Sequence, residues 1–445
     1  MPNIVNVSVS QQVASAPSTL QRTGALISQG ATTLAVGATQ LLTSVSSLTS
    51  ILATSEAVSS VSWSTGIVTL TTATPHGIPT SDVVLGVIAG VTVSGSTTNG
   101  YNGNFVVTST GANTLTYAVT SNPGAGVTTS AFFTLEDVAE LTAMVNTFFA
   151  QGSNLGVYVL ELGTNTVANG VTQLEAYIAA NVGHPTTSAT PQFYAYLLPT
   201  TWDVTAAQTM AKMYTGTTAQ VYFYVSTTLA TYTGWTGIKS VFAVLPSPSA
   251  PTSEFSTASA FWVALNYNPS ASNLASPMEY SFVYAVTPYS ALTNTQQTNL
   301  LAVGMNWIGT GAQGQISNTL IEGGTFADLN PFNYWYSTDW LAINVQIALA
   351  AAIINGSNNP TNPLYYNQAG INALQKVAQA TCNNGISFGL ILSPCSVNAI
   401  SFTTYVAQNP SNYAAGIYNG LSVTFVPLRG FTSITIYLTA SNIPV

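Results

Sequence analysis

The stretch Gln192-Phe193-Tyr194-Ala195-Tyr196-Leu197-Leu198-Pro199 decides the fold class. Apolar residues follow one another from Phe193 to Leu198, and a proline ends the run. A strand with one face in water alternates apolar and polar residues, whereas a strand covered on both faces is apolar throughout. The stretch therefore predicts a buried strand in a sheet that carries helices on both faces.

Similar apolar runs recur on both sides of this strand, with helical patterns between them. Strands are predicted at residues 156–162, 192–198, 219–225, 239–245 and 280–286. Helices are predicted at 170–181 and at 204–214. Because strands and helices alternate, the predicted fold class is mixed α/β, spread over several domains.

Residues 59–131 have a different composition, rich in Thr, Val, Gly, Ser and Asn. Short strand patterns at 67–71, 83–87, 104–109 and 115–119 are separated by turn signals. A helix is predicted before this segment at 39–52, and Thr134 is predicted to cap another helix that ends at Gln151-Gly152. The segment is therefore predicted to be an all-β module inserted into one domain, with its ends close together.

The C-terminal third predicts helices followed by strands. A long helix is expected at 338–355, and a second at 368–383 is expected to end at Asn384-Gly385. Strands are predicted near 400–406, at 421–426 and at 434–439.

The composition excludes several classes of protein. Charged residues are 4 % of 445, with 5 Lys or Arg against 13 Asp or Glu and a net charge of −8. Five dispersed cations cannot neutralise a run of phosphates, so we expect no nucleic-acid partner. The hydrophobic content of 47 % excludes a disordered chain. So little charge favours a subunit whose faces are covered by copies of itself.

No membrane-spanning or secreted segment is predicted. The best apolar stretch, residues 340–354, is shorter than about 18 residues and is interrupted by Asn344 and Gln346. The first eight residues lack a cationic region and a continuous apolar run, so no signal peptide is expected. Cys382 and Cys395 are too few for a disulfide framework and are expected to be reduced, although a bridge between them stays open.

The sequence offers few groups for catalysis. The histidines His76 and His184 lie in turn-like segments, without metal-ligand or triad spacing. Residues 304–314 contain Gly309-x-Gly311-x-x-Gly314 but lack the βαβ setting of a dinucleotide site. We therefore expect no cofactor and no metal.

One enzymatic alternative rests on two carboxylates. Glu161 ends a predicted strand and Asp203 begins a predicted helix, so the two could form the acid–base pair of a hydrolase. A helix cap or an ion pair is the commoner role for such residues. This alternative requires a cleft that joins the two carboxylates.

Both ends of the chain carry strand patterns, and the N-terminal one has no hairpin partner in the sequence that follows it. Apolar and polar residues alternate over residues 4–10 and again over 434–439. Unpaired strands of this kind can add to a sheet of another chain, or they can complete the chain's own sheet. We predict strands shared between subunits, built on Val5, Val7, Val9, Val423, Phe425, Ile434, Ile436 and Leu438.

The order of motifs in the C-terminal third resembles the sheath subunit of contractile bacteriophage tails. Gly324-Thr325-Phe326-Ala327-Asp328 precedes Trp340, a long apolar helix and an Asn/Pro loop. Gly370, Asn384-Gly385 and Tyr405-Val406-Ala407-Gln408-Asn409-Pro410 follow. Residues 4–10 also resemble the start of sheath-like phage proteins, and residues 59–131 are similar to small modules inserted in phage virion proteins.

The resemblance implies a structural, non-enzymatic subunit of a virion tail, assembled in the host cytoplasm. Subunits would stack as rings around the tail tube, and contraction would drive the tube through the host envelope, leading to genome ejection. The implied partners are other copies, the tail tube protein, and baseplate and tail-terminator proteins, without membrane insertion. Lys376 lies on a helix expected near the tube, so it is a candidate tube contact; solvation of an exposed face is the alternative.

Together, these patterns predict five segments within a sheath-protein fold. They are an N-terminal arm (1–20), a sheath body (21–58 and 132–325), an outward-facing inserted β domain (59–131), a C-terminal domain near the tube (326–420) and C-terminal arm strands (421–445). The alternatives are another phage tail protein or a surface-layer assembly protein. A tail tube subunit should be smaller and mainly β-structure, so the long predicted helices argue against it.

Overall fold

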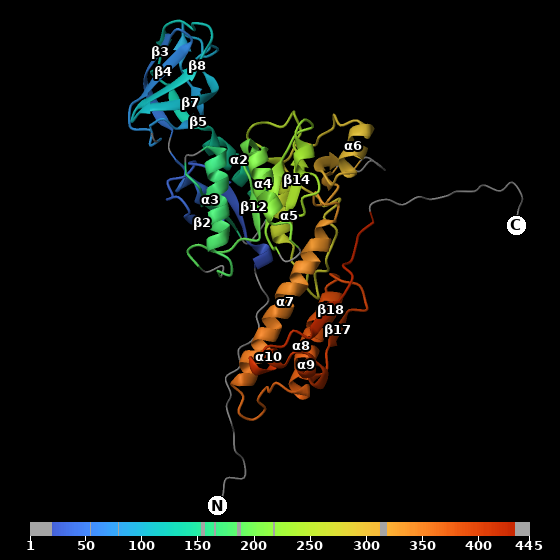
Figure 1. The fold of residues 1–445 in the computed structure, drawn as a ribbon. Coiled ribbons are helices and arrows are strands. Elements are labelled where there is room, and N and C mark those ends of the chain that lie inside the picture. Colours follow the sequence, from blue (N-terminus) through green and yellow to red (C-terminus); the bar gives the residue numbers. More distant parts are fainter. Residues whose placement is uncertain are drawn as a thin grey trace, which may run out of the picture. The chain divides into compact units, whose positions relative to one another are not determined.

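The computed structural model describes residues 20–53, 55–78, 80–152, 156–163, 166–184, 188–216, 219–311 and 318–431 (Figure 1). The chain forms two compact units. The larger unit comprises Thr19–Tyr267 and Tyr280–Asn330, and the smaller unit comprises Met1–Ser18, Asn268–Glu279 and Pro331–Val445. Both units are discontinuous, because the chain enters the smaller unit at residue 268 and returns before residue 280.

The larger unit is built on an eight-stranded sheet. Its order is β16-β15-β14-β13-β12-β1-β11-β2. The six inner strands are parallel, and the two outermost strands, β2 and β16, run antiparallel to their neighbours. The strands are β1 (Gly24–Ser28), β2 (Thr39–Leu42), β11 (Val157–Glu161), β12 (Ala195–Leu197), β13 (Tyr222–Ser226), β14 (Val241–Leu245), β15 (Asn306–Thr310) and β16 (Thr319–Glu322).

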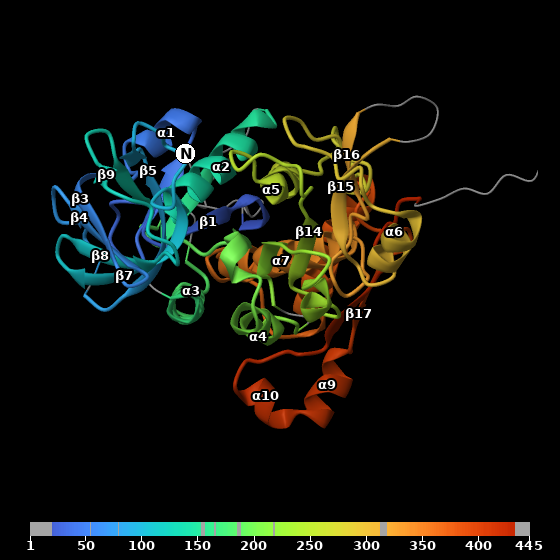
Figure 2. The ribbon, with the colours of Figure 1, turned by 90° about the horizontal axis from the view of Figure 1, so that it is seen from above.

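Helices cover both faces of this sheet, as the apolar strand runs predict. Helices α2 (Glu136–Ala150) and α5 (Ser256–Asn266) lie on one face, and α3 (Val167–Ala180) and α4 (Thr205–Met213) lie on the other (Figure 2). Every residue of β1, β12, β13 and β14 is consequently buried. A short helix, α6 (Asn294–Leu301), precedes β15.

Residues 56–135 form a closed six-stranded barrel with its own apolar core. All four strands predicted in this segment are present, and two more strands, β3 and β10, complete the barrel. The last strand leads directly into α2. In barrel order the strands are β10 (Phe132–Leu135), β3 (Glu56–Ser64), β4 (Ile67–Thr72), β8 (Thr114–Ala118), β7 (Gly103–Gly111) and β5 (Val83–Ala89); β6 (Thr92–Val93) and β9 (Gly126–Val127) form a separate ribbon.

The smaller unit combines two long helices with a two-stranded sheet. Helices α7 (Phe332–Ser357) and α8 (Gln368–Ser387) are antiparallel, since Trp340 packs on Phe388 at one end and Gly356 contacts Leu364 at the other. The remaining elements are β17 (Ser396–Ala399), α9 (Phe402–Gln408), α10 (Pro410–Ala414) and β18 (Leu421–Thr424). Cys382 and Cys395 are buried free thiols, and burial raises the pKa of Cys382 to about 12.

Helix α7 is longer than the apolar stretch predicted from the sequence. An 18-residue window within it has mean hydropathy 1.5, and 11 % of that window is buried. By length and composition alone the helix could cross a membrane, a test that core helices also pass. Its first half is nevertheless buried in the unit and includes Asp339, which is 2 % exposed.

Four sequence predictions of secondary structure are wrong. Residues 39–52 form β2 and a five-residue helix, α1 (Val45–Thr49), because their Ser and Thr content disfavours one long helix. Residues 280–286 form only an isolated bridge, since Tyr280 and Ala285 have positive φ angles. Residues 402–408 are helical after a Ser401 cap, and α8 continues through Asn384-Gly385.

The start of α2 also differs from its prediction. Thr134 belongs to strand β10, and Leu135 rather than Thr134 is the N-cap of the helix. The helix ends at Gln151, as predicted. Strand β1, helix α5 and strands β15 and β16 were not predicted, because their apolar residues show no clear period in the sequence.

Candidate functional site

The hairpin of β17 and β18 has a register that determines where each backbone group points. The pairs are Ser396 with Thr424, Val397 with Val423, Asn398 with Ser422 and Ala399 with Leu421. In the same register, Ile400 N donates to Gly420 O at 3.0 Å. Hydrogen-bonded and non-hydrogen-bonded pairs alternate in an antiparallel ladder. Val397 and Val423 therefore form a non-hydrogen-bonded pair, with backbone groups that point to opposite outer edges.

The outer edge of β18 is open within the described part of the chain. The backbone groups of Leu421, Val423 and Phe425 point away from β17, and no described residue hydrogen-bonds to them. These three side chains are half-buried, whereas Ser422 and Thr424 are exposed. An edge with free donors and acceptors and one apolar face can accept another strand.

The structure describes only two of the predicted arm residues. Val423 lies in β18, and Phe425 follows that strand directly. The other six, Val5, Val7, Val9, Ile434, Ile436 and Leu438, lie outside the described residues.

Lys376 lies on the exposed face of α8, with Asn372, Ala373 and Ala380. No hydrogen bond or ion pair joins it to any residue that the structure describes. No Asp or Glu occurs between residue 340 and the end of the sequence. A partner that contacts this helix face therefore meets an uncompensated cation.

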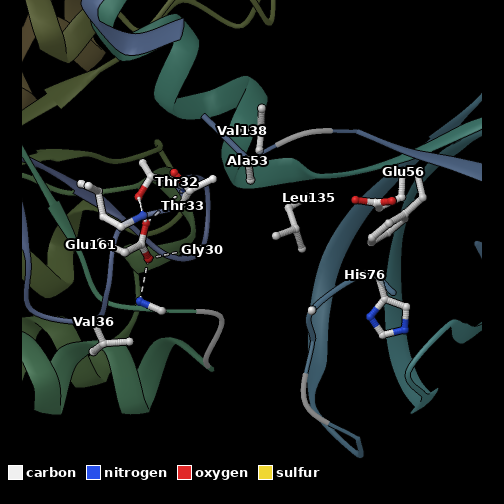
Figure 3. Close-up of a pocket in the computed structure, with 14 residues that line it drawn as sticks. Gly30, Thr32, Thr33, Val36, Ala53, Glu56, His76, Leu135, Val138 and Glu161 are labelled. Carbon is white, nitrogen blue, oxygen red and sulfur yellow. Dashed lines mark hydrogen bonds between the residues drawn. The ribbon is translucent and has the colours of Figure 1, made fainter. Parts of the chain in front are cut away.

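Glu161 is a buried carboxylate held by the chain's own donors (Figure 3). It is 1 % exposed and lies at the end of β11. Its Oε1 accepts from Gly30 N and Gly163 N at 2.6 Å each. Its Oε2 accepts from Ser28 Oγ and Thr32 Oγ1 at 2.7 Å each. Both oxygens are thus occupied by structural hydrogen bonds.

Asp203 is also saturated, with partners different from those of Glu161. Its Oδ1 accepts from Trp235 Nε1 at 2.6 Å, and its Oδ2 accepts from the hydroxyls of Thr227 and Thr231. The two carboxylates share no partner, and only Glu161 lines the hollow shown in Figure 3. The arrangement gives no support to the hydrolase alternative, because each carboxylate hydrogen-bonds to a separate loop.

The sheet has the strand order of a doubly wound fold, in which ligands bind where the order reverses, between β1 and β12. Here that position is filled by protein. Trp202 is fully buried, and its Nε1 donates to Gln29 Oε1 at 2.6 Å. The side chains at the switch point therefore bind one another.

The other residues that the sequence offered for catalysis or ligand binding do not come together in one site. His76 lines the hollow of about 320 Å³ in Figure 3, where its Nδ1 accepts from Ile78 N, and His184 Nδ1 lies 3.0 Å from Thr190 O. Gly309 lies within β15 and not after a strand, as a dinucleotide fingerprint requires. Among the described residues there is no group of three or more His, Cys, Asp or Glu side chains that could hold a metal.

Comparison with solved structures identifies the fold. The chain is similar over 99 % of its length to the helical sheath of the anti-feeding prophage in the contracted state, covering 100 % of that chain with a TM-score of 0.50 and 11 % identity. It is similar to a chain of that prophage's contracted baseplate, with a TM-score of 0.51, 11 % identity and coverage of 99 % and 98 %. The chain is also similar to a sheath tail protein from Listeria innocua, with a TM-score of 0.45, 11 % identity and coverage of 92 % of each chain.

No protein-family model matches the chain, and no curated protein matches it by sequence. The chain thus has the fold of a tail sheath protein, at a sequence identity too low for sequence comparison alone to find it. Two polar residues that bind the outer edge of β17, Gln375 and Gln379, had no signal in the sequence, because a glutamine on a helix is ordinarily a solvated residue.

Proposed function

We propose that this protein is the structural subunit of a contractile tail sheath, and that it is not an enzyme. The observation that carries the proposal is the similarity of nearly the whole chain, 99 %, to a helical sheath in its contracted state. The saturated carboxylates and the filled switch point support a structural role. The subunit would belong to a virion tail, with assembly in the host cytoplasm.

Subunits would stack as rings around a rigid tube and would be linked by exchanged terminal strands. The open edge of β18 supports this linkage, because it offers unpaired backbone groups beside an apolar face. The residues proposed to add strands to such edges are Val5, Val7, Val9, Ile434, Ile436 and Leu438, with Val423 and Phe425 on the receiving side.

Each segment would have the role that the sequence suggests. The arms would be residues 1–20 and, of the segment 421–445, the residues that follow the β17–β18 hairpin, and the inserted β domain at 59–131 would face outward from the body. The domain at 326–420 would lie near the tube, and Lys376 would contact the tube protein. The other partners would be baseplate and tail-terminator proteins, with no cofactor, no nucleic acid and no membrane insertion.

Contraction would draw on the difference in free energy between two packings of the same subunits. Strand links made of backbone hydrogen bonds can persist while the faces between bodies separate and re-form. Faces with few charges lower the cost of this exchange, since buried ion pairs are expensive to break.

Negative-stain microscopy of the purified full chain tests the proposal. We expect hollow tubes with ring striations from the wild-type protein. Dispersed monomers under all conditions would contradict it, and flat arrays would favour the surface-layer alternative.

A matched pair of variants tests the N-terminal arm. Val5, Val7 and Val9 changed together to Ser should leave folded monomers that form no tubes. The control changes Asn6, Ser8 and Ser10 to Thr, on the other face of the same strand pattern, and should still give tubes. Tubes from the valine variant would exclude the arm.

A further inference from the structure

The two edges of the β17–β18 hairpin are not equivalent, and we propose that α8 closes one of them. Gln375 and Gln379 of α8 occupy the backbone groups on the outer edge of β17, so that a strand from a second copy can add only beside β18. This inference rests on the proposed function, since it concerns the strands that link subunits.

The hydrogen bonds of the two glutamines follow the edge of β17. Gln375 Nε2 donates to Val397 O at 2.7 Å, and Val397 N donates to Gln379 Oε1 at 3.1 Å. Gln379 Nε2 also donates to Cys395 O at 3.0 Å. The register places these groups on the outer edge, where an added strand would need them. Side-chain amides thus replace a neighbouring strand along this edge.

The edge of β18 has no such cover among the described residues. The outward backbone groups of Leu421, Val423 and Phe425 are unpaired there, and their side chains continue an apolar face. An incoming strand therefore gains several backbone hydrogen bonds beside β18, whereas beside β17 only the outward groups of Ala399 remain, next to the occupied groups of Val397 and Cys395. Edges blocked by the protein itself are a recognised device against uncontrolled strand pairing.

Residues 4–10 of a second copy are the occupant that the chain length favours. The described part of the chain begins at Leu20, so nine residues separate Ser10 from it. Nine residues can span up to about 30 Å. The C-terminal pattern begins at Ile434, which only two residues separate from Phe431, and so has a much shorter reach.

Two proline variants of the full chain test the assignment of the edge. Val423→Pro removes an outward N–H of β18, and Ala399→Pro removes the outward N–H of β17 at the neighbouring non-hydrogen-bonded pair, Ala399 with Leu421. Neither N–H has a partner among the described residues, so both variants should fold. We expect Val423→Pro to abolish tubes and Ala399→Pro to keep them.

The other outcomes separate the two proposals. Tubes lost with Ala399→Pro, with or without Val423→Pro, would show that the β17 edge is used and would overturn the inference. Tubes kept by both variants would overturn strand addition at this hairpin while leaving the sheath function intact. A wild-type chain that forms no tubes counts against the proposed function instead.

Disulfide trapping gives a second measurement, the yield of cross-linked dimers, which does not depend on tube formation. Copies carrying Val7→Cys are mixed with tagged copies carrying Val423→Cys or Ala399→Cys, and oxidised glutathione is added. The native thiols are buried, and wild-type protein without added cysteines gives the background level of cross-linking. Cross-linked dimers should form with Val423→Cys and be at least about tenfold fewer with Ala399→Cys. Equal yields with the two variants, or no dimers with Val423→Cys, would overturn the inference.

Discussion

At the scale of single residues, three carboxylates of the larger unit, one buried and two half-buried, are bound by hydroxyl, indole and backbone donors. Glu161 and Asp203 follow this pattern, and Glu254 accepts from Ser256 Oγ, Thr287 N and Thr287 Oγ1. A carboxylate that accepts several such bonds has its acceptor oxygens satisfied without a cation nearby. A chain with five Lys or Arg residues can therefore bury acids by using its many Ser and Thr residues.

Replacing Glu161 by Gln should destabilise the larger unit. The amide group turns one acceptor into a donor that faces existing donors, so at least one buried N–H or O–H loses its partner. We expect a loss of about 1–3 kcal/mol in the free energy of unfolding, measured by urea titration and circular dichroism. Glu175→Gln is the control: Glu175 is half-buried in α3 without a hydrogen bond to a described residue, and it should change stability by less than about 0.5 kcal/mol. Equal effects would contradict this account of Glu161.

Glu322 gives a prediction for pH. Burial raises the pKa of its carboxyl group, so the folded state holds its proton more tightly than the unfolded state does. Its contribution to stability is therefore present below pH 4.5 and is lost as the pH rises through the folded pKa. Glu322→Gln should raise the melting temperature slightly at pH 7 and leave it unchanged at pH 4. If the melting temperature rises as much at pH 4 as at pH 7, titration of Glu322 is excluded as the cause.

At the scale of elements, the second half of α7 exposes an apolar face. Ile353 and Ile354 are each 49 % exposed on a helix whose first half is buried. Single exposed apolar residues are common, but two adjacent exposed isoleucines on a helix of this hydropathy are typical of a face that a partner covers.

The double variant Ile353→Asn and Ile354→Asn should fold normally and form fewer tubes. The substitutions remove apolar surface that packing would bury, while they disturb no contact in the buried half of the helix. The measurement is the pelleted fraction after ultracentrifugation, with Val182→Asn, an exposed residue of the larger unit, as the control. An unchanged pellet would mean that this face is not part of an interface.

The sequence predicted elements well where one physical signal dominated. The run from Phe193 to Leu198 predicted a strand covered on both faces, and β12 lies in the middle of an α/β/α layer. The helix expected at 368–383 begins at Gln368, as predicted.

Predictions failed where tertiary contacts overrode the local signal. Gly385 should end α8, yet it lies inside the helix, where its missing Cβ makes room for Ile391 and Trp340. The glutamines that close the edge of β17 could not be predicted, because their role depends on a register between segments about 20 residues apart. The arms remain a prediction.

At the scale of the whole molecule, charge is divided unequally between the two units. The smaller unit has two carboxylates, Glu279 and Asp339, and two cations, Lys376 and Arg429. The remaining eleven carboxylates and three cations belong to the larger unit, so the net charge of −8 lies entirely there. The unit that carries the open strand edge is electrically neutral.

Assembly should consequently depend little on ionic strength. Salt screens interactions between exposed charges, and the proposed strand link involves backbone groups and apolar side chains. Tubes should persist between about 0.05 and 1 M NaCl, as measured by light scattering and microscopy. Dissociation at high salt would indicate that ion pairs, and not strand links, hold the subunits together.

The scarcity of cations also determines where a protease can act. Lys212 and Lys376 lie within helices, Lys239 is 4 % exposed, and Arg22 has a buried Nε. Arg429 is exposed and lies outside helices and strands, so it is the most accessible site for trypsin in the described chain. A brief digestion should cut there and release residues 430–445, which would yield the subunit without its C-terminal strand pattern from intact protein in one step.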